Sequence, residues 1–359
     1  MGRITRRATG LGLASGLIAA PAIVRAQPES FQWRMVTSWP KNLPGPGVSA
    51  ERLAKRIEAM TAGRISIQVY AAGELVPAFE VLDAVGGGTA EMAHTAAVFW
   101  MGKVRASAFF LAMPMGLTPI EHNSWIVHGG GQVLWDELYA DFGVKPFMAG
   151  NTGMSMGGWF KQPLEGAADL QGQKFRMPGL GGEMYAPFGI IQVSLPPGEI
   201  LPALQAGTID AAEFAGPSSD LGLALYQAAP YYYWPGLHEP NGTGECLVNL
   251  ETWNRLPDDL KTVIANACAA ENAEALAEAE LRNAAALKKL IAEGVELRRF
   301  PDDIQARARE AVGDIYAGFE SEGDIERRIL ASYREALSRG DLWPSISVAA
   351  FHQARNPGT

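Results

Sequence analysis

The residues of this sequence that could do catalytic chemistry do not form the patterns that enzymes need. None of the five histidines stands in an HExxH pattern; they are His94, His122, His128, His238 and His352. The glycine clusters at 86–88 and 129–131 lack the GxGxxG and GxxxxGK[ST] patterns that hold phosphates. We therefore expect core or solvated histidines, and a protein that binds its ligand without transforming it.

One arginine stands where a ligand-binding residue would be useful. Arg176 lies in the alternating run 174–177, which ends at Pro178-Gly179, so its side chain could point into a crevice at a strand end. A guanidinium offers two parallel donors that match a carboxylate. From the pattern alone, a surface arginine in a salt bridge is the simpler interpretation.

Polar and aromatic residues also stand at the ends of other predicted strands. Asn151 and Thr152 offer neutral hydrogen-bond donors for carboxylate or keto oxygens. Trp39, Phe99 and Trp100 stand at the starts of loops and could wall an apolar pocket. Core packing is the alternative for each of the three aromatic residues.

The elements that must position these residues alternate between strands and helices, which predicts an α/β fold. Helices are expected over 49–60, from 80 to the glycines at 86–88, and from 302 onward. Strands are expected at 31–39, 65–70, 109–113, 144–149, 154–160, 174–177, 211–215, 245–250 and 295–300. Loops gather at the strand ends, which is where open α/β sheets bind ligands.

The C-terminal third contains one unusually long helical segment. Residues 257–293 are dense in Ala, Glu, Leu and Lys, with no Gly or further Pro, and predict a helix of about 35 residues, roughly 50 Å long. Such a helix should bridge two lobes or pack on a partner subunit. One face carries Ala265, Ala269, Ala273 and Ala277, which permits close packing and makes a homodimer possible.

The N-terminus predicts export. Arg3, Arg6 and Arg7 precede a short Gly- and Ala-rich apolar run, and small residues up to Ala26 suit signal-peptidase cleavage. The run is too short to span a bilayer, and the arginine pair after Thr5 resembles a twin-arginine signal. Residues 1–26 are therefore predicted to be a signal peptide, possibly of the twin-arginine type, and the mature chain is expected in the periplasm.

The charge of the mature chain excludes one class of partner. Of the 30 basic residues, four arginines fall within residues 1–26, which leaves 26 basic against 39 acidic residues and a net charge of −13. Nucleic-acid binding needs a basic surface, so it is not expected. About 330 mature residues suggest two domains.

The only two cysteines are Cys246 and Cys268. An exported chain could join them in a disulfide. The favoured interpretation is that both are small buried apolar residues, one in a strand and one in the long helix.

Motifs along most of the chain resemble one family. In order they are MVTSWP at 35–40, FWMGK at 99–103, AGNTG at 149–153, GGWF at 157–160, GQKFRM at 172–177, LPALQAGTIDAAE at 201–213 and YYYWPG at 231–236. This sequence resembles the extracytoplasmic solute receptors of tripartite ATP-independent periplasmic (TRAP) transporters. It is most similar to the branch that binds 2-oxo acids and related small carboxylates.

The resemblance implies a two-lobed α/β receptor with the periplasmic-binding-protein-like fold, whose lobes are joined by hinge strands and the long bridging helix. Lobe I would comprise 27–152 and 241–293, and lobe II 153–240 and 294–359. The receptor would capture a small organic acid, most simply a 2-oxo or 2-hydroxy monocarboxylate, and deliver it to a TRAP membrane permease. A periplasmic enzyme or a sensor acting on similar carboxylates is the alternative.

The resemblance also implies roles for single residues. Arg176 is the family's carboxylate anchor. In the 2-oxo acid branch a cation, Na⁺ or Ca²⁺, is held by the residue matching Glu213 and by the carbonyl at Phe214, where the branch usually has Trp. The Gln that completes this set is replaced by Ser155, a shorter and weaker ligand, so survival of the cation site is open. Glu239 matches a family acid and is a further candidate contact for ligand or metal.

Overall fold

The computed structural model describes residues 2, 29–340 and 342–356. The predicted signal peptide, residues 1–26, lies outside the described residues apart from Gly2. In the part of the chain that is described, no helix is both long and apolar enough to cross a membrane.

The strands form two sheets. The first has the order β2 (Ile65–Tyr70), β1 (Phe31–Thr37), β3 (Met92–Thr95), β10 (Thr243–Asn249) and β4 (Val144–Asn151). The second has the order β11 (Glu296–Arg299), β9 (Tyr231–Trp234), β5 (Gly158–Phe160), β8 (Ala211–Ala212), β6 (Lys174–Arg176) and β7 (Ile191–Val193). The α/β fold class is confirmed.

In the first sheet, β10 crosses over from far along the chain. It lies between β3 and β4 and runs antiparallel to both, whereas β1 is parallel to β2 and β3. The chain therefore enters the second sheet after β4 and returns to the first sheet in β10. With the later crossing from β10 through α9 (Asp258–Ala292) to β11, three connections join the two sheets.

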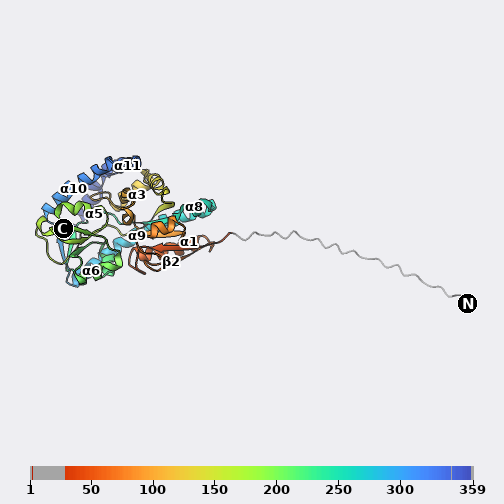
Figure 1. Ribbon diagram of the computed structural model, residues 1–359, viewed down its shortest axis with the longest axis horizontal. Coiled ribbons are helices and arrows are strands. Elements are labelled where there is room, and N and C mark those ends of the chain that lie inside the picture. Colours follow the sequence, from red (N-terminus) through yellow and green to blue (C-terminus); the bar gives the residue numbers. More distant parts are fainter. Residues whose placement is uncertain (1, 3–28, 341, 357–359) are drawn as a thin grey trace.

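Helices cover both sheets. The α-helices are α1 (Pro46–Met60), α2 (Val81–Gly86), α3 (Pro119–His128), α4 (Gly131–Ala140), α5 (Leu180–Tyr185), α6 (Ile200–Ala206), α7 (Pro217–Gly222), α8 (Leu250–Arg255), α9 (Asp258–Ala292), α10 (Asp302–Glu320), α11 (Asp324–Gly340) and α12 (Ala350–Arg355). In Figure 1, α1, β2 and α8 lie toward one end of the body and α5, α6 and α10 toward the other, with α9 between them.

The long helix α9 joins the two halves, as predicted. It begins after Pro257 and ends before Glu293, within one residue of the predicted limits at each end. Its first half packs on β4 and α1, and Ile264 and Cys268 belong to the core under the first sheet. Its second half contacts α7, and Leu290 belongs to the core of the second sheet. The helix is long because it packs into the cores of both sheets.

The C-terminal helices divide their contacts between the halves. α10 packs on α5, next to the second sheet, whereas α11 contacts α3 and α4. The lobe boundaries remain a proposal. They assign α11 to lobe II, although α11 packs on α3 and α4 of lobe I.

One predicted strand is wrong. Residues 109–113 do not form a strand; the 3₁₀ helix η2 (Arg105–Phe110) ends within them and a turn follows. Phe110 stacks on Trp125 and Trp135, with ring centroids 5.5 and 5.0 Å away. A short apolar run that is buried by aromatic packing looks like a buried strand in the sequence.

Candidate functional site

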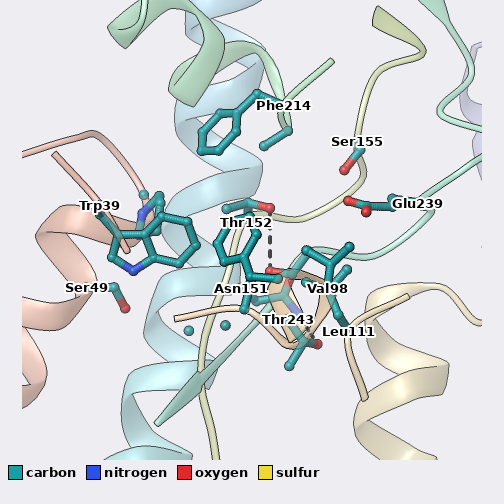
Figure 2. A pocket seen from close by; sticks show the side chains of 18 of the residues that line it. Trp39, Ser49, Val98, Leu111, Asn151, Thr152, Ser155, Phe214, Glu239 and Thr243 are labelled. Atoms are coloured by element: carbon teal, nitrogen blue, oxygen red, sulfur yellow. Dashed lines mark hydrogen bonds between the residues drawn. The ribbon is translucent and has the colours of Figure 1, made fainter. Parts of the chain in front are cut away.

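A pocket opens where strand ends of the two sheets meet. It contains about 640 Å³ of empty space, open solvent included. Its walls include parts of β3, β4 and β10 and the segment after β1 on one side, and β6 and the segment after β8 on the other. Figure 2 shows Trp39 and Ser49 on one side of the pocket and Ser155 and Glu239 on the opposite side. The predicted residues that line it are Trp39, Phe99, Asn151, Thr152, Ser155, Arg176, Glu213, Phe214 and Glu239.

Arg176 is the buried cation of this pocket. Its side chain is only 1% exposed, so the surface salt bridge that the pattern allowed is excluded. Nε donates to the Leu195 carbonyl (3.1 Å), and Nη1 donates to both the carbonyl and the carboxylate Oε1 of Glu213, the latter at 2.8 Å. Nη2 has no hydrogen-bond partner among the described residues. The guanidinium is thus fixed by the protein on one side and keeps one donor nitrogen free.

Glu213 is held between two cationic groups. Its Oε1 accepts from Arg176, and its Oε2 lies 2.9 Å from Nε2 of His238, whose side chain is fully buried. Burial alone would raise the pKa of Glu213, but His238 and Arg176 hold it below its usual range. Burial alone would lower the pKa of His238, but Glu213 raises it. This arrangement favours a carboxylate at Glu213 and an imidazolium at His238.

A second carboxyl group lies next to the first. Glu239 is 9% exposed, and burial together with repulsion from Glu213 raises its pKa to about 8. Ligand atoms of Glu213, His238 and Glu239 lie within 4.8 Å of one another. The nearby Ser155 hydroxyl is buried and has no hydrogen-bond partner among the described residues. Two buried acids and an unpaired hydroxyl are groups whose cost of burial a cation would offset.

A buried aspartate positions the loop that carries Glu213. Asp220 accepts hydrogen bonds from the Trp159 indole (2.8 Å), the Tyr232 hydroxyl (2.7 Å) and the backbone N–H of Ala215 (3.1 Å). Because Ala215 follows Glu213 by two residues, these bonds fix the chain just beyond β8. Burial raises the pKa of Asp220 to about 6 despite these three donors.

At the end of the pocket near Trp39 and Ser49, the polar side chains form hydrogen bonds with other groups of the protein. Trp39 donates from its indole N–H to Nδ1 of His94 (2.9 Å), and His94 Nε2 donates to the Ala149 carbonyl (2.8 Å). The Ser49 hydroxyl donates to the buried carboxylate of Glu271 (2.6 Å). Burial lowers the pKa of His94, so its ring is neutral in this arrangement.

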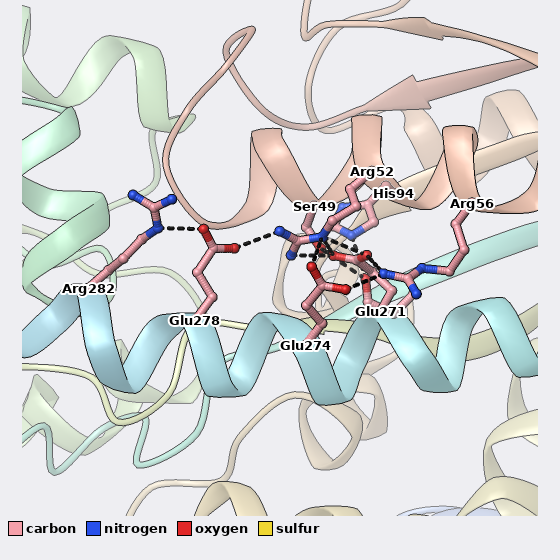
Figure 3. Close-up of polar contacts among 9 residues, drawn as sticks. Ser49, Arg52, Arg56, His94, Glu271, Glu274, Glu278 and Arg282 are labelled. Carbon is pink, nitrogen blue, oxygen red and sulfur yellow. Dashed lines mark hydrogen bonds and ion pairs between the residues drawn. The ribbon is translucent and has the colours of Figure 1, made fainter.

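Figure 3 shows that Glu271 also binds two arginines of α1. Arg52 donates to both oxygens of Glu271, at 2.7 to 3.0 Å, and also to Glu278 (2.7 Å). Arg56 contacts Glu271 at 3.4 Å. These bonds tie α1, which carries the pocket residue Ser49, to α9.

Asn151 and Thr152 line the pocket, but their side chains also form hydrogen bonds with other protein groups. The Asn151 amide donates to Asn241 (2.9 Å) and Thr243 (3.3 Å), and its oxygen accepts from the backbone N–H of Gly153 (2.8 Å). The Thr152 hydroxyl lies 3.5 Å from the Gly242 carbonyl. Asn151 therefore shapes the pocket wall through a buried polar network.

Two features differ from the sequence-based expectation. Trp100 is not among the residues that line the pocket; it is buried in the core, and its indole N–H donates to the Tyr139 hydroxyl (2.8 Å). His238, expected to be an ordinary core or solvated histidine, instead contacts Glu213. In the sequence, only its position directly before Glu239 hints at a role in the site. Its contact with Glu213, which lies 25 residues earlier, cannot be inferred from the spacing of the two residues.

Two sheets bridged by a long helix, with a ligand-sized pocket and a buried guanidinium between them, define a bilobed solute-binding protein. The chain matches the DctP family, described as "Bacterial extracellular solute-binding protein, family 7", over residues 36–322, and belongs to it. Members of this family are solute-binding receptors.

Known relatives support this assignment over nearly the whole chain. A monocarboxylate 2-oxoacid-binding periplasmic protein of Nostoc is 43% identical over 328 residues, which cover 91% of this chain and 90% of that protein. A TRAP transporter solute-binding protein of Bordetella bronchiseptica, a mixed-occupancy dimer with copurified calcium and picolinate, is 34% identical with a TM-score of 0.89. It covers 91% of this chain and 97% of its own.

A third relative was solved with a different ion and acid. The TRAP periplasmic solute-binding protein of Pseudoalteromonas atlantica, with bound sodium and pyruvate, is 32% identical with a TM-score of 0.87. The match covers 90% of this chain and 99% of that one.

Proposed function

We propose that this protein is a periplasmic receptor that captures a small 2-oxo or 2-hydroxy monocarboxylate together with a cation and delivers the acid to a TRAP membrane permease. The observation that carries the proposal is the buried Arg176 guanidinium, which keeps Nη2 free inside the pocket of an acidic protein. Relatives solved with pyruvate or picolinate support the choice of acid.

The pocket favours a single carboxylate. Arg176 is the only lysine or arginine among the described residues that line it. A free guanidinium nitrogen in a buried site gives a charge-assisted hydrogen bond of fixed direction. A second carboxylate on the ligand would be buried without a cationic partner, which is costly. We therefore infer that dicarboxylates bind weakly.

The remainder of the pocket suits an apolar ligand tail. Trp39, Phe99 and Phe214 contribute aromatic wall, and the Phe214 ring centroid lies 5.9 Å from the Arg176 guanidinium carbon. Ser49 and His94, which could otherwise bind a polar tail, already hydrogen-bond within the protein. A tail that carries hydroxyl groups would find no free hydrogen-bond donor in them.

The residues present fit a bound cation. The candidate ligands are the carboxylates of Glu213 and Glu239, the unpaired hydroxyl of Ser155 and the Phe214 carbonyl, all hard oxygen donors suited to Na⁺ or Ca²⁺. When bound, such an ion supplies positive charge to the keto and carboxylate oxygens of the acid. Arg176 and His238 meanwhile fix Glu213, and the Ser155 hydroxyl replaces the longer Gln of the branch.

The remaining assignments rest on the family. Family membership places the protein outside the cytoplasm, and the periplasm is the specific location that we propose, with residues 1–26 as its signal peptide. Transport without catalysis is favoured because the family consists of solute-binding proteins. The homodimer remains a proposal, supported by the dimer of the Bordetella relative.

A thermal-shift comparison tests the proposed function. Ligand binding stabilises the folded state by RT ln(1 + [L]/Kd). Pyruvate and 2-oxobutanoate should raise Tm in buffer with calcium or sodium, and 2-oxoglutarate should raise it much less. Equal shifts with dicarboxylates, or no shift with any 2-oxo acid, would contradict the proposal. Unchanged concentrations of the acids after incubation would exclude the enzyme alternative.

A further inference from the structure

The two cysteines lie in the same apolar core, on two elements that contact each other. Cys246 lies in β10 and Cys268 in α9, and both belong to the apolar core under the first sheet. Side chains alternate along β10: Cys246 and Val248 point toward this core, whereas Leu247 packs in a different core on the other face of the sheet. Cys268 is on the buried face of α9, directed at the same layer.

The electrostatics of Cys246 also reflect its neighbour. The Cys268 thiol and burial both raise the pKa of the Cys246 thiol. Both side chains are reduced and are 0% and 1% exposed. A buried thiol with a raised pKa does not react in the folded state, because the thiolate is the nucleophile.

We propose that Cys246 and Cys268 form an intramolecular disulfide when the chain folds in an oxidising compartment, joining β10 to α9. The family is extracellular, and disulfides persist outside the cytoplasm. The bond would close a loop of 21 residues, 247–267. A chain folded before export would instead bury both thiols in the reduced state.

The oxidant is a small-molecule or protein disulfide. The thiolate of one cysteine attacks a sulfur of that disulfide, forms a mixed disulfide and releases one thiol. The thiolate of the other cysteine then attacks the protein sulfur of the mixed disulfide and releases the second thiol. Two protein thiols are oxidised to one disulfide, one external disulfide is reduced to two thiols, and the number of protons is conserved.

The bond leaves the ligand pocket intact. Thr243 in β10 and Ala275 in α9 line the pocket, but the two cysteines lie in the layer between the first sheet and the N-terminal half of α9. The link does not cross from one sheet to the other, so it does not restrict closure around a ligand. The disulfide stabilises the first lobe without changing ligand affinity.

The test compares two refolded samples of the full chain. The denatured, reduced wild type is refolded with a mixture of oxidised and reduced glutathione, or with dithiothreitol. After removal of these reagents it is unfolded in guanidinium chloride at about pH 8, where thiols ionise, and alkylated with iodoacetamide. After oxidative refolding, intact mass should show no alkylation and a loss of about 2 Da in a monomer. Its Tm should exceed that of the reduced sample by roughly 5 °C.

Cys268→Ala is the matched control, since alanine is small and apolar. It should keep one thiol that can be alkylated once unfolded, and its Tm should be the same in both buffers. Two alkylated thiols in the oxidatively refolded wild type, or a bond between molecules, would overturn the proposal, as would a Tm that falls on oxidation. The wild-type comparison needs no mutation and no ligand, so its outcome is independent of the proposed function.

Discussion

His238 Nε2 lies 2.9 Å from Glu213 Oε2, while the other oxygen of the same carboxylate accepts from Arg176. Both neighbours are almost completely buried. Glu213 is therefore oriented from two sides before any ligand binds, and His238 is a positioning residue for the pocket.

Substitution of His238 tests this role. His238→Leu removes the donor and leaves one carboxylate oxygen unpaired, which should weaken ligand binding by about 1–3 kcal/mol, or roughly five- to 150-fold. His238→Gln keeps an N–H donor of similar reach and should lose less. Isothermal titration calorimetry with pyruvate checks both variants. Equal losses for Gln and Leu would indicate that the volume of the ring matters and its hydrogen bond does not.

Glu213→Gln separates two states of the site. If Glu213 helps to hold a cation, the neutral amide should weaken binding, and wild-type binding should fall in buffer that lacks both calcium and sodium. If Ser155 has removed the cation site, binding should ignore cations and Glu213→Gln should equal or exceed wild type, because a carboxylate repels the anion. We expect the first result. Calorimetry of wild type and variant, with and without calcium, gives effects of opposite sign in the two cases.

Ser49→Ala tests whether the Ser49 hydroxyl, at the far end of the pocket, donates to the ligand. The Ser49 hydroxyl is committed to Glu271, so its loss should lower the free energy of unfolding by about 1 kcal/mol. Affinity for pyruvate should change less than twofold. Arg52 keeps the Glu271 carboxylate paired in the variant. A large loss of affinity with unchanged stability would show that this hydroxyl binds ligand.

The buried carboxyl group of Glu245 should make the free energy of unfolding depend on pH. It is 1% exposed, and burial raises its pKa well above the usual 4.5, although the nearby Tyr139 hydroxyl acts in the opposite direction. The folded state therefore holds a proton that the unfolded state releases. Stability from this group is complete below about pH 4.5 and is lost as pH rises toward the folded pKa, by up to about 1.4 kcal/mol per pH unit.

Glu245→Gln is the measurement for this group, because the amide is neutral at every pH and similar in size to the protonated acid. Urea unfolding should show the variant more stable than wild type at pH 8, with the difference shrinking toward pH 5. A difference that stays constant across this range would mean that Glu245 does not titrate anomalously.

Local sequence predicted the long helix better than it predicted the strands around the pocket. α9 was located to within one residue at each end, because 36 residues lie between Pro257 and Gly294 without a further Pro or Gly. β8, by contrast, has two residues, and its position depends on pairing with β5 and β6. Such pairing is a long-range effect that a short apolar run does not encode.

The same distinction applies to the site. Arg176 and Glu213 were located through motifs, and the structure brings them within 2.8 Å of each other. The contact of His238 with Glu213 depends on how the loop after β9 folds back over β8, and Trp100 lies in the core although its neighbour Phe99 lines the pocket. Neither fact is contained in residue type or spacing.

Titration of pyruvate into wild type, Arg176→Lys and Arg176→Ala, in buffer with calcium, tests the central claim most directly. Wild type should bind with one site per chain. Arg176→Ala should lose about 2–5 kcal/mol of binding free energy. Arg176→Lys should also bind poorly, because an ammonium cannot hold Leu195 and Glu213 and also present a donor of fixed direction to the ligand. Because Arg176 also holds Glu213, unfolding curves of each variant must accompany the titration. Folded variants that bind pyruvate as tightly as wild type would contradict the account.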